Sequence, residues 1–414
     1  MPHAAGPAAS KPARPTAGPH SESRPRKLCQ QADVIWIGGS PPPQSWMRVL
    51  TRRAVRRWAV VAAGVGILCS LPAVVAALPV PGSALSAAQL RARIAASATV
   101  SYQGYAQSYV DLGLPSLPDL GNVISLLDGS TDQYVWYRSP GQWRADQLTA
   151  AGENDIYQTS RGTYQWNYTN NELTRVVGAQ PVRLPQAPDL LPPDLARRLV
   201  GFASRAARFS RLPSQRIAGI DAAGLRLVPV DSASTISQVE IWADPRTGLP
   251  VQVEVFGAGA AAPLLMSRFL NLSETAPATA TLTPQPGPGI DFATTTLPDA
   301  EGVLNGYGPP LPAQLGTIDR VANPSGLSDV AAYGGGFSRF AVVPLPTRAG
   351  NAALSAASSA GLTVTLGAGT AVVVQTPLIA ILLARSPAGQ VYLLTGAVTV
   401  SRLEYAATQL LESQ

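Results

Sequence analysis

The stretch that decides the fold is "VEIWADPRTGLPVQVEVF", residues 239–256. In 239–243 apolar residues alternate with Glu and Trp, and in 251–255 three valines alternate with polar residues. A period of two residues is typical of a strand that buries one face. Between the two runs, Pro245 fixes its backbone φ angle and Gly248 accepts conformations that are costly for other residues. The stretch therefore predicts an antiparallel hairpin whose loop is a turn and not a catalytic loop.

Further strand patterns lie upstream of this hairpin. Residues 99–112, "TVSYQGYAQSYVDL", alternate; residues 131–149 predict a hairpin, and residues 154–177 predict three short strands. Two helices are expected among them. Ser86 is a suitable N-cap for a first helix over "AAQLRARIAASA". The second, "PPDLARRLVGFASRAARF" at 192–209, places Leu195, Leu199 and Phe202 on one face. The sequence thus predicts an α+β fold.

This order of elements carries a family resemblance. A first helix, the Tyr- and Trp-rich "VWYRSPGQWRAD", a mid-chain helix and the hairpin "VEIWADPRTGLPVQVEVF" resemble actinobacterial members of the LolA-like superfamily of envelope lipoprotein carriers. The resemblance covers residues 85–296. It implies a strongly curved antiparallel half-barrel that is covered by helices, with a cavity that receives acyl chains.

The C-terminal third extends the resemblance. Residues 297–332 are rich in Pro and Gly and predict a linker, and residues 333–414 predict a small α/β domain that closes with an amphipathic helix. A LolA-like domain followed by such a domain is similar to the RseB/MucB family of sigma-E regulators. That similarity implies a membrane anti-sigma factor as a possible partner. The short apolar run 377–384 predicts a buried strand because it is too short to span a membrane.

The positive charge of the chain lies at its N-terminus. The net charge is +6, but residues 1–57 hold ten Lys and Arg against two carboxylates, so the remainder carries −2. Residues 1–46 predict a disordered basic tail, with Met47 as an alternative start. Residues 47–80, where arginines precede an uncharged run, predict a cleaved signal peptide or a retained signal anchor. Either one places the rest of the chain outside the cytoplasm, at the membrane or released into the envelope.

The chemistry available to this body is limited. After Cys69 the sequence contains no His, Lys or Cys. This absence excludes Ser-His-Asp and Cys-His nucleophiles, Schiff bases and the usual zinc ligands. The acidic body also offers no basic surface for nucleic acid. We therefore expect no enzyme, no cofactor, no metal and no nucleic-acid partner.

The sequence predicts a binding protein in place of an enzyme. We expect an extracytoplasmic protein that binds a lipid or an acylated protein in a hydrophobic cavity, as a carrier or an envelope-stress sensor. The residues expected to line the cavity are Val239, Ile241, Val251, Val253 and Val255 on the sheet, and Leu195, Leu199 and Phe202 on the covering helix. Two alternatives stay open: a protein-interaction module that regulates an anti-sigma factor, and a hydrolase that uses only carboxylates.

Overall fold

The computed structural model describes residues 56–66, 69, 79–113, 125–178, 185–203, 207–296, 308–321, 330–359 and 361–413. The chain divides into two units, residues 1–72 and residues 73–414. In the first unit, residues 56–66 are helical and expose Trp58. Among the described residues, no helix has the length and apolarity that a membrane span requires. The predicted tail, 1–46, lies outside the described residues, as does most of the predicted signal or anchor, 47–80.

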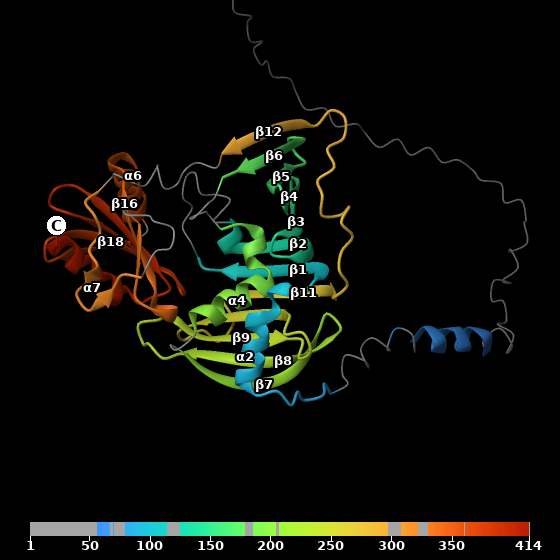
Figure 1. Ribbon diagram of the computed structural model, residues 1–414. Helices are drawn as coiled ribbons and strands as arrows, with labels where there is room; N and C mark the ends of the chain where they lie inside the picture. Colours follow the sequence, from blue (N-terminus) through green and yellow to red (C-terminus); the bar gives the residue numbers. More distant parts are fainter. Residues whose placement is uncertain are drawn as a thin grey trace, which may run out of the picture. The chain divides into compact units, whose positions relative to one another are not determined.

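A sheet of twelve strands dominates the second unit (Figure 1). Its strands are β1 (Tyr102–Asp111), β2 (Asp128–Ser139), β3 (Gln142–Thr149), β4 (Gly152–Thr159), β5 (Gly162–Asn167), β6 (Glu172–Val177), β7 (Ala207–Ile217), β8 (Ile220–Pro229), β9 (Ile236–Ala243), β10 (Pro250–Gly257), β11 (Leu265–Ser273) and β12 (Asp291–Thr296). Their spatial order is β12-β6-β5-β4-β3-β2-β1-β11-β10-β9-β8-β7. Two meanders, β1–β6 and β7–β11, therefore join where β1 pairs with β11, and all neighbours are antiparallel except β12 and β6.

Two helices pack on one face of this sheet. The first, α2 (Ala87–Ala96), begins at Ser86, whose hydroxyl accepts from the Gln89 N–H while the Gln89 side chain accepts from the Ser86 N–H. The predicted N-cap is confirmed. The second, α4 (Pro192–Phe202), follows the short 3-10 helix η2 (Ala187–Leu190) and begins with two prolines, which lack only N–H groups that would stay unpaired there. Figure 1 shows both helices crossing the strands of the second meander.

The predicted extent of the second helix, 192–209, was wrong. The helix ends at Phe202, and residues 207–209 already belong to β7. Strand β7 forms a long ladder with β8, in which Phe209 pairs with Leu227. The ladder pairs nine residues of β7 with residues of β8, and a longer helix would give up this pairing. Local helix propensity therefore yields here to a hairpin partner that lies further along the chain.

The hairpin at 239–256 is confirmed as β9 and β10. Its loop is built on Asp244, which is 1% exposed and whose backbone N–H donates to the Leu249 carbonyl at 2.9 Å. The Asp244 side chain accepts from the backbone N–H of Arg246 at 2.7 Å. Gly248 has a φ of +76°, and its N–H donates to the Asp244 carbonyl at 2.8 Å. The carboxylate therefore closes the turn, as the sequence predicts.

A second sheet, of six antiparallel strands, follows in the order β15-β16-β20-β19-β18-β17. Its strands are β15 (Ala331–Tyr333), β16 (Phe340–Leu345), β17 (Leu362–Leu366), β18 (Gly369–Gln375), β19 (Ala380–Arg385) and β20 (Val391–Gly396). Helix α7 (Val400–Glu412) packs on one face through Leu403 and Leu410, and α6 (Thr347–Ser358) packs on the other through Ala357. The predicted buried strand within 377–384 is confirmed by β19.

The stretch predicted as a linker, 297–332, is described only in part. Within it, β13 (Gln314–Leu315) and β14 (Ile318–Asp319) form a small hairpin that contributes Leu315 and Ile318 to the core under α7. Residues 297–307 and 322–329 lie outside the described residues.

Candidate functional site

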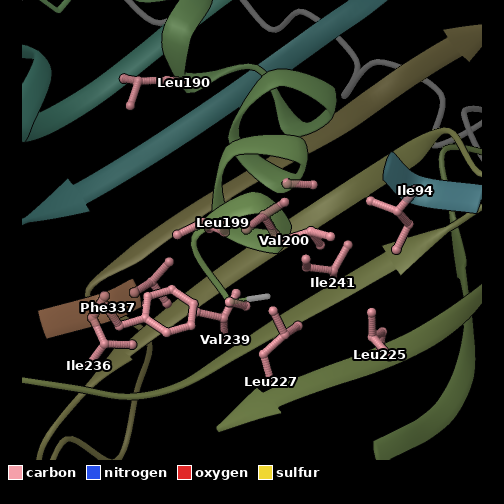
Figure 2. Packing of buried hydrophobic residues seen from close by; sticks show 14 of the residues in the cluster. Ile94, Leu190, Leu199, Val200, Leu225, Leu227, Ile236, Val239, Ile241 and Phe337 are labelled. Atoms are coloured by element: carbon pink, nitrogen blue, oxygen red, sulfur yellow. The ribbon is translucent and has the colours of Figure 1, made fainter. Parts of the chain in front are cut away.

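Six of the eight residues predicted to line a cavity belong to one hydrophobic layer. Val239 and Ile241 on β9, and Val253 and Val255 on β10, are at most 3% exposed. Leu199 of α4 packs among them, and Leu195 packs against the same cluster. Figure 2 shows Leu199 and Val200 of α4 lying over Val239 and Ile241. The structure therefore brings six of these residues together in one layer.

This layer is filled by the protein's own side chains. Helix α2 contributes Leu90 and Ile94, and β8 contributes Leu225 and Leu227, all of them completely buried. Phe337, from the segment before β16, also packs in this layer, although it is far along the sequence from the other residues (Figure 2). The space between helices and sheet is consequently a packed core in this structure.

Val251 and Phe202 lie elsewhere. Val251 belongs to a different cluster, together with Tyr102, Trp242 and Phe269, because the register of β10 against β9 shifts between Pro250 and Gln252. Such a bulge interrupts the alternation of side chains along a strand. Phe202, at the end of α4, is 43% exposed, and the Arg339 guanidinium lies 5.6 Å from the centre of its ring.

The two cavities described in the structure lie away from this layer. The larger has a volume of about 800 Å³. Its wall includes the turns after β2 and β4, the segment 279–286, Leu173 and Phe292. The smaller has a volume of about 510 Å³ and is lined by Gln103, Gly104, Tyr105, Tyr134, Trp136, Asn271 and Ser273. None of the predicted cavity residues lines either one.

A buried cluster of charges on β3 and β4 is the feature that the sequence did not reveal. Asp146 and Asp155 are 2% and 1% exposed, and Glu153 lies beside them. Nη2 of Arg144 lies 2.5 Å from Asp146, 2.9 Å from Asp155 and 3.8 Å from Glu153. The Tyr157 hydroxyl donates to Asp155 Oδ2 at 3.1 Å, whereas Asp155 Oδ1 is buried without a hydrogen-bond partner.

One guanidinium for three carboxylates leaves this cluster short of positive charge. Burial raises the pKa of Asp155 to about 8, and the charge of Asp146 adds to the rise while Arg144 opposes it. Burial likewise raises the pKa of Asp146 to about 6, against the opposing hydrogen bond from Arg144. A proton is therefore retained in the cluster at neutral pH.

Among the described residues, this cluster also has the geometry closest to a metal site. One carboxylate oxygen from each of Asp146, Glu153 and Asp155 lies within 4.8 Å of the others. Oxygen ligands suit hard cations such as Ca²⁺. Here, however, Arg144 already pairs with all three carboxylates, so the arrangement is accounted for as an ion-pair network around that guanidinium.

The residues of the cluster are visible in the sequence, but their spacing alone does not show that they lie close together. Asp146 pairs with Asp155, and Leu148 with Glu153, across the hairpin of β3 and β4. Residues 144–146, "RAD", and 153–155, "END", therefore face each other only if the turn lies at 150–151. If the register of β3 against β4 had been assigned from the sequence, it would have placed Asp146 and Asp155 on the same face of the sheet.

The fold is comparable with several solved structures. MucB of Pseudomonas aeruginosa, in its MucA/MucB complex, is 19% identical with a TM-score of 0.44; the match covers 78% of this chain and 96% of that one. MucB in complex with MucA(peri) is 18% identical with a TM-score of 0.44, covering 78% and 97%. A LolA superfamily protein of Nitrosomonas europaea is 12% identical with a TM-score of 0.23, covering 49% and 99%.

Comparisons of the sequence with family models and curated proteins find no match. The likeness to these solved structures is at low sequence identity throughout.

Proposed function

We propose that this chain is a non-catalytic binding protein of the cell envelope whose ligand is a lipid or an acylated protein. The sequence after residue 69 lacks the His, Lys and Cys side chains on which most nucleophilic and metal-dependent catalysis relies. The arginines before the apolar run at 58–78 favour an extracytoplasmic position for everything after it. Residues 85–296 would form the ligand-binding half-barrel domain, residues 333–414 the second domain, and residues 47–80 the signal or anchor.

The observation that carries this proposal is the composition of the layer beneath α4. Phe337 is the only aromatic residue among the buried members of this cluster, and all the others are aliphatic. The neighbouring clusters differ, because Tyr102, Tyr137 and Trp242 fill one and Tyr157 and Trp166 fill another. Aliphatic side chains make no directional bonds, so a hydrocarbon chain can replace their mutual contacts without breaking hydrogen bonds.

Binding would require α4 to move away from the sheet. Its N-terminus has no side-chain cap, and its buried residues, Pro192, Pro193, Ala196, Leu199 and Val200, are all apolar. An acyl chain that enters the layer gains about 0.8 kcal/mol per buried methylene, which offsets the contacts that α4 gives up. Leu195, Leu199 and Phe202 would then cover the chain, with Val239, Ile241, Val253 and Val255 beneath it.

Native mass spectrometry of the intact chain, extracted gently from its own membranes, tests this proposal. We expect a ligand of lipid mass at a one-to-one ratio. After delipidation, cis-parinaric acid should bind and should lower the hydrogen-exchange protection of α4 while β1–β5 stay unchanged. Recovery without lipid, together with no binding of cis-parinaric acid, would contradict lipid binding.

The packing of the layer favours a second candidate, a protein-interaction module. Because side chains fill the layer, the chain needs no ligand to complete its core. The partner implied by the sequence resemblance is a membrane anti-sigma factor. Capture of one membrane protein by the intact chain, with an affinity that added lipid does not change, would support this candidate over lipid binding.

The geometry gives no support to a carboxylate-only hydrolase. Asp146 and Asp155 are close enough to act together, but both are buried, both pair with Arg144, and neither lines the two described cavities. General acid catalysis requires a carboxyl group within reach of a substrate.

A further inference from the structure

The hollow of about 510 Å³ on β1, β2 and β11 is separate from the layer under α4. Two rows of side chains that cross these strands build it. In one row, Gln103 of β1 pairs with Trp136 of β2 and with Ser273 of β11. In the other, Tyr105 pairs with Tyr134 and with Asn271. Because residues two apart on a strand point to the same side, all six side chains share one face of the sheet.

The three aromatic rings form a continuous surface. The centres of the Tyr105 and Tyr134 rings are 4.8 Å apart, and those of Tyr134 and Trp136 are 6.1 Å apart. The rings stay accessible, with Tyr134 44% exposed. Tyr102 and Tyr137, on the same strands but on the opposite face, are buried and stack at 4.9 Å. The strands thus use their inward aromatics for the core and present the outward ones to solvent.

Neighbouring charges hold the rings in place without lining the hollow. The Tyr105 hydroxyl donates to Asp132 Oδ1 at 3.0 Å, and the Arg144 guanidinium lies 5.0 Å from the centre of the Trp136 ring. Arg144 is itself fixed by Asp146 and Asp155. The buried charge cluster therefore supports the aromatic surface from the side.

The remaining lining groups offer hydrogen bonds. Every lining residue is neutral. The side-chain amides of Gln103 and Asn271 form no hydrogen bond within the part of the chain that the structure describes. Each amide both donates and accepts, whereas the Ser273 hydroxyl already donates to Thr275 Oγ1 at 3.0 Å and accepts from the Thr275 N–H at 3.3 Å. A hydrocarbon ligand would leave the amides of Gln103 and Asn271 without water or partner, and an anionic ligand would meet no positive charge in the wall.

We propose that this hollow is a binding site for a neutral saccharide. A pyranose ring presents an apolar C–H face, which stacks on aromatic rings, and an edge of hydroxyl groups, which pair with amides. Three rings that lie beside three neutral polar side chains match both surfaces. The site goes beyond the lipid-binding proposal, and the two tests are independent because the residues involved lie in different parts of the fold.

A glycan array with neutral, acidic and sulfated oligosaccharides, probed with the intact chain, tests the inference. We expect retention of neutral glycans, followed by measurable affinity for the best of them in calorimetry. Tyr134→Ala should lower that affinity by about tenfold, and Asn271→Ala should lower it several-fold. Tyr109→Ala removes an exposed tyrosine of β1 that does not line the hollow, so it should change the affinity by less than about twofold.

Circular dichroism establishes that each variant is folded, and Trp136→Ala provides an independent third substitution in the wall. The inference is overturned if no neutral glycan is retained above the level of the Tyr134→Ala variant. It is overturned equally if anionic glycans are retained in preference, or if a proline-rich peptide binds the hollow in place of sugars.

Discussion

At the scale of single residues, the least expected feature is the charge cluster around Arg144. Three carboxylates share one guanidinium, two of them, Asp146 and Asp155, are buried, and Asp155 keeps one oxygen unpartnered. A protonated carboxyl group there can donate a hydrogen bond to a neighbouring carboxylate. The proton reduces the excess negative charge, and the hydrogen bond gives the unpartnered oxygen a partner. The raised pKa of Asp155 is the expected consequence.

This cluster makes stability depend on pH. The pKa of Asp155 is about 8 in the folded chain against an ordinary value of 3.8. Between those values the folded chain binds more protons than the unfolded chain, so the free energy of unfolding falls as pH rises from about 4 to about 8. Asp155→Asn should flatten that decline, as measured by urea unfolding followed through tryptophan fluorescence.

Asp111→Asn, at an exposed carboxylate of β1, is the control for the substitution itself. If the wild-type chain gains stability as pH rises across this range, or if Asp155→Asn keeps the full decline, the charge cluster does not behave as we describe.

A second prediction at this scale concerns Gly248 in the turn between β9 and β10. Its φ is +76°, and a Cβ atom there would lie 2.4 Å from the Arg93 carbonyl oxygen of α2. Gly259 has the same φ with open space around it. Gly259→Ala should lose about 1–2 kcal/mol from backbone strain alone. Gly248→Ala should lose clearly more, because it also displaces α2. Equal losses in urea unfolding would show that the contact with Arg93 is unimportant.

At the scale of elements, α4 combines a packed side and an open rim. Leu199 is 7% exposed and belongs to the aliphatic layer, whereas Phe202, three residues on, is 43% exposed. Both were expected to line a cavity, yet the structure gives them different environments. Leu199 should therefore contribute mainly to stability, and Phe202 should contribute mainly to ligand binding.

Leu199→Ala should lower the free energy of unfolding by about 2–5 kcal/mol, the range for deleting a packed leucine side chain. Phe202→Ala should change it by less than about 1 kcal/mol, since Phe202 is 43% exposed and does not belong to the buried cluster. If α4 covers an acyl chain, Phe202→Ala should nevertheless weaken binding of cis-parinaric acid. Large destabilisation by Phe202→Ala would contradict its position at the rim.

At the scale of the whole second unit, the loop between β8 and β9 of the first sheet forms hydrogen bonds with residues of the second sheet's domain. Thr235, between β8 and β9, donates its N–H to the Ala397 carbonyl and its hydroxyl to the Leu378 carbonyl at 2.6 Å. Asp231 accepts from the Ser338 hydroxyl at 2.5 Å and pairs with Arg402 of α7 at 3.2 Å. Leu378 and Phe337 also belong to the aliphatic layer. Both sheets thus share contacts and a core.

Arg402→Ala should weaken this connection. Burial opposes ionisation of Asp231, but hydrogen bonds from Ser338 and Ala233 and the charge of Arg402 together lower its pKa. A lowered pKa contributes stability at neutral pH that is lost as pH falls below about 4. Because both side chains are partly exposed, we expect a loss of about 1 kcal/mol or less.

Calorimetry should show a lower melting temperature for Arg402→Ala at neutral pH, with a smaller difference from the wild type in acid. Arg348→Ala, at an exposed arginine of α6, is the matched control. Identical melting of Arg402→Ala and wild type at neutral pH would mean that the Asp231 pair does not stabilise the connection.

The parts of the fold that depend on neighbours in sequence could be predicted from the sequence. The alternation within 239–256, together with Pro245 and Gly248, specifies β9, β10 and their turn, because strand faces and turn angles are local properties. Ser86 and Gln89 specify the start of α2 for the same reason. The absence of His, Lys and Cys after residue 69 is likewise a property of composition alone.

Tertiary structure alone decided how those elements meet. The charge cluster depends on the register of β3 against β4, and the hollow on β1, β2 and β11 depends on the register of β1 against its two neighbours. The end of α4 depends on the ladder that β7 forms with β8. The filling of the layer under α4 depends on α2, β8 and Phe337, which come from distant parts of the chain. The physical reason is common to all four: pairing and packing energies arise between segments far apart in sequence, where no local pattern records which partner will be chosen.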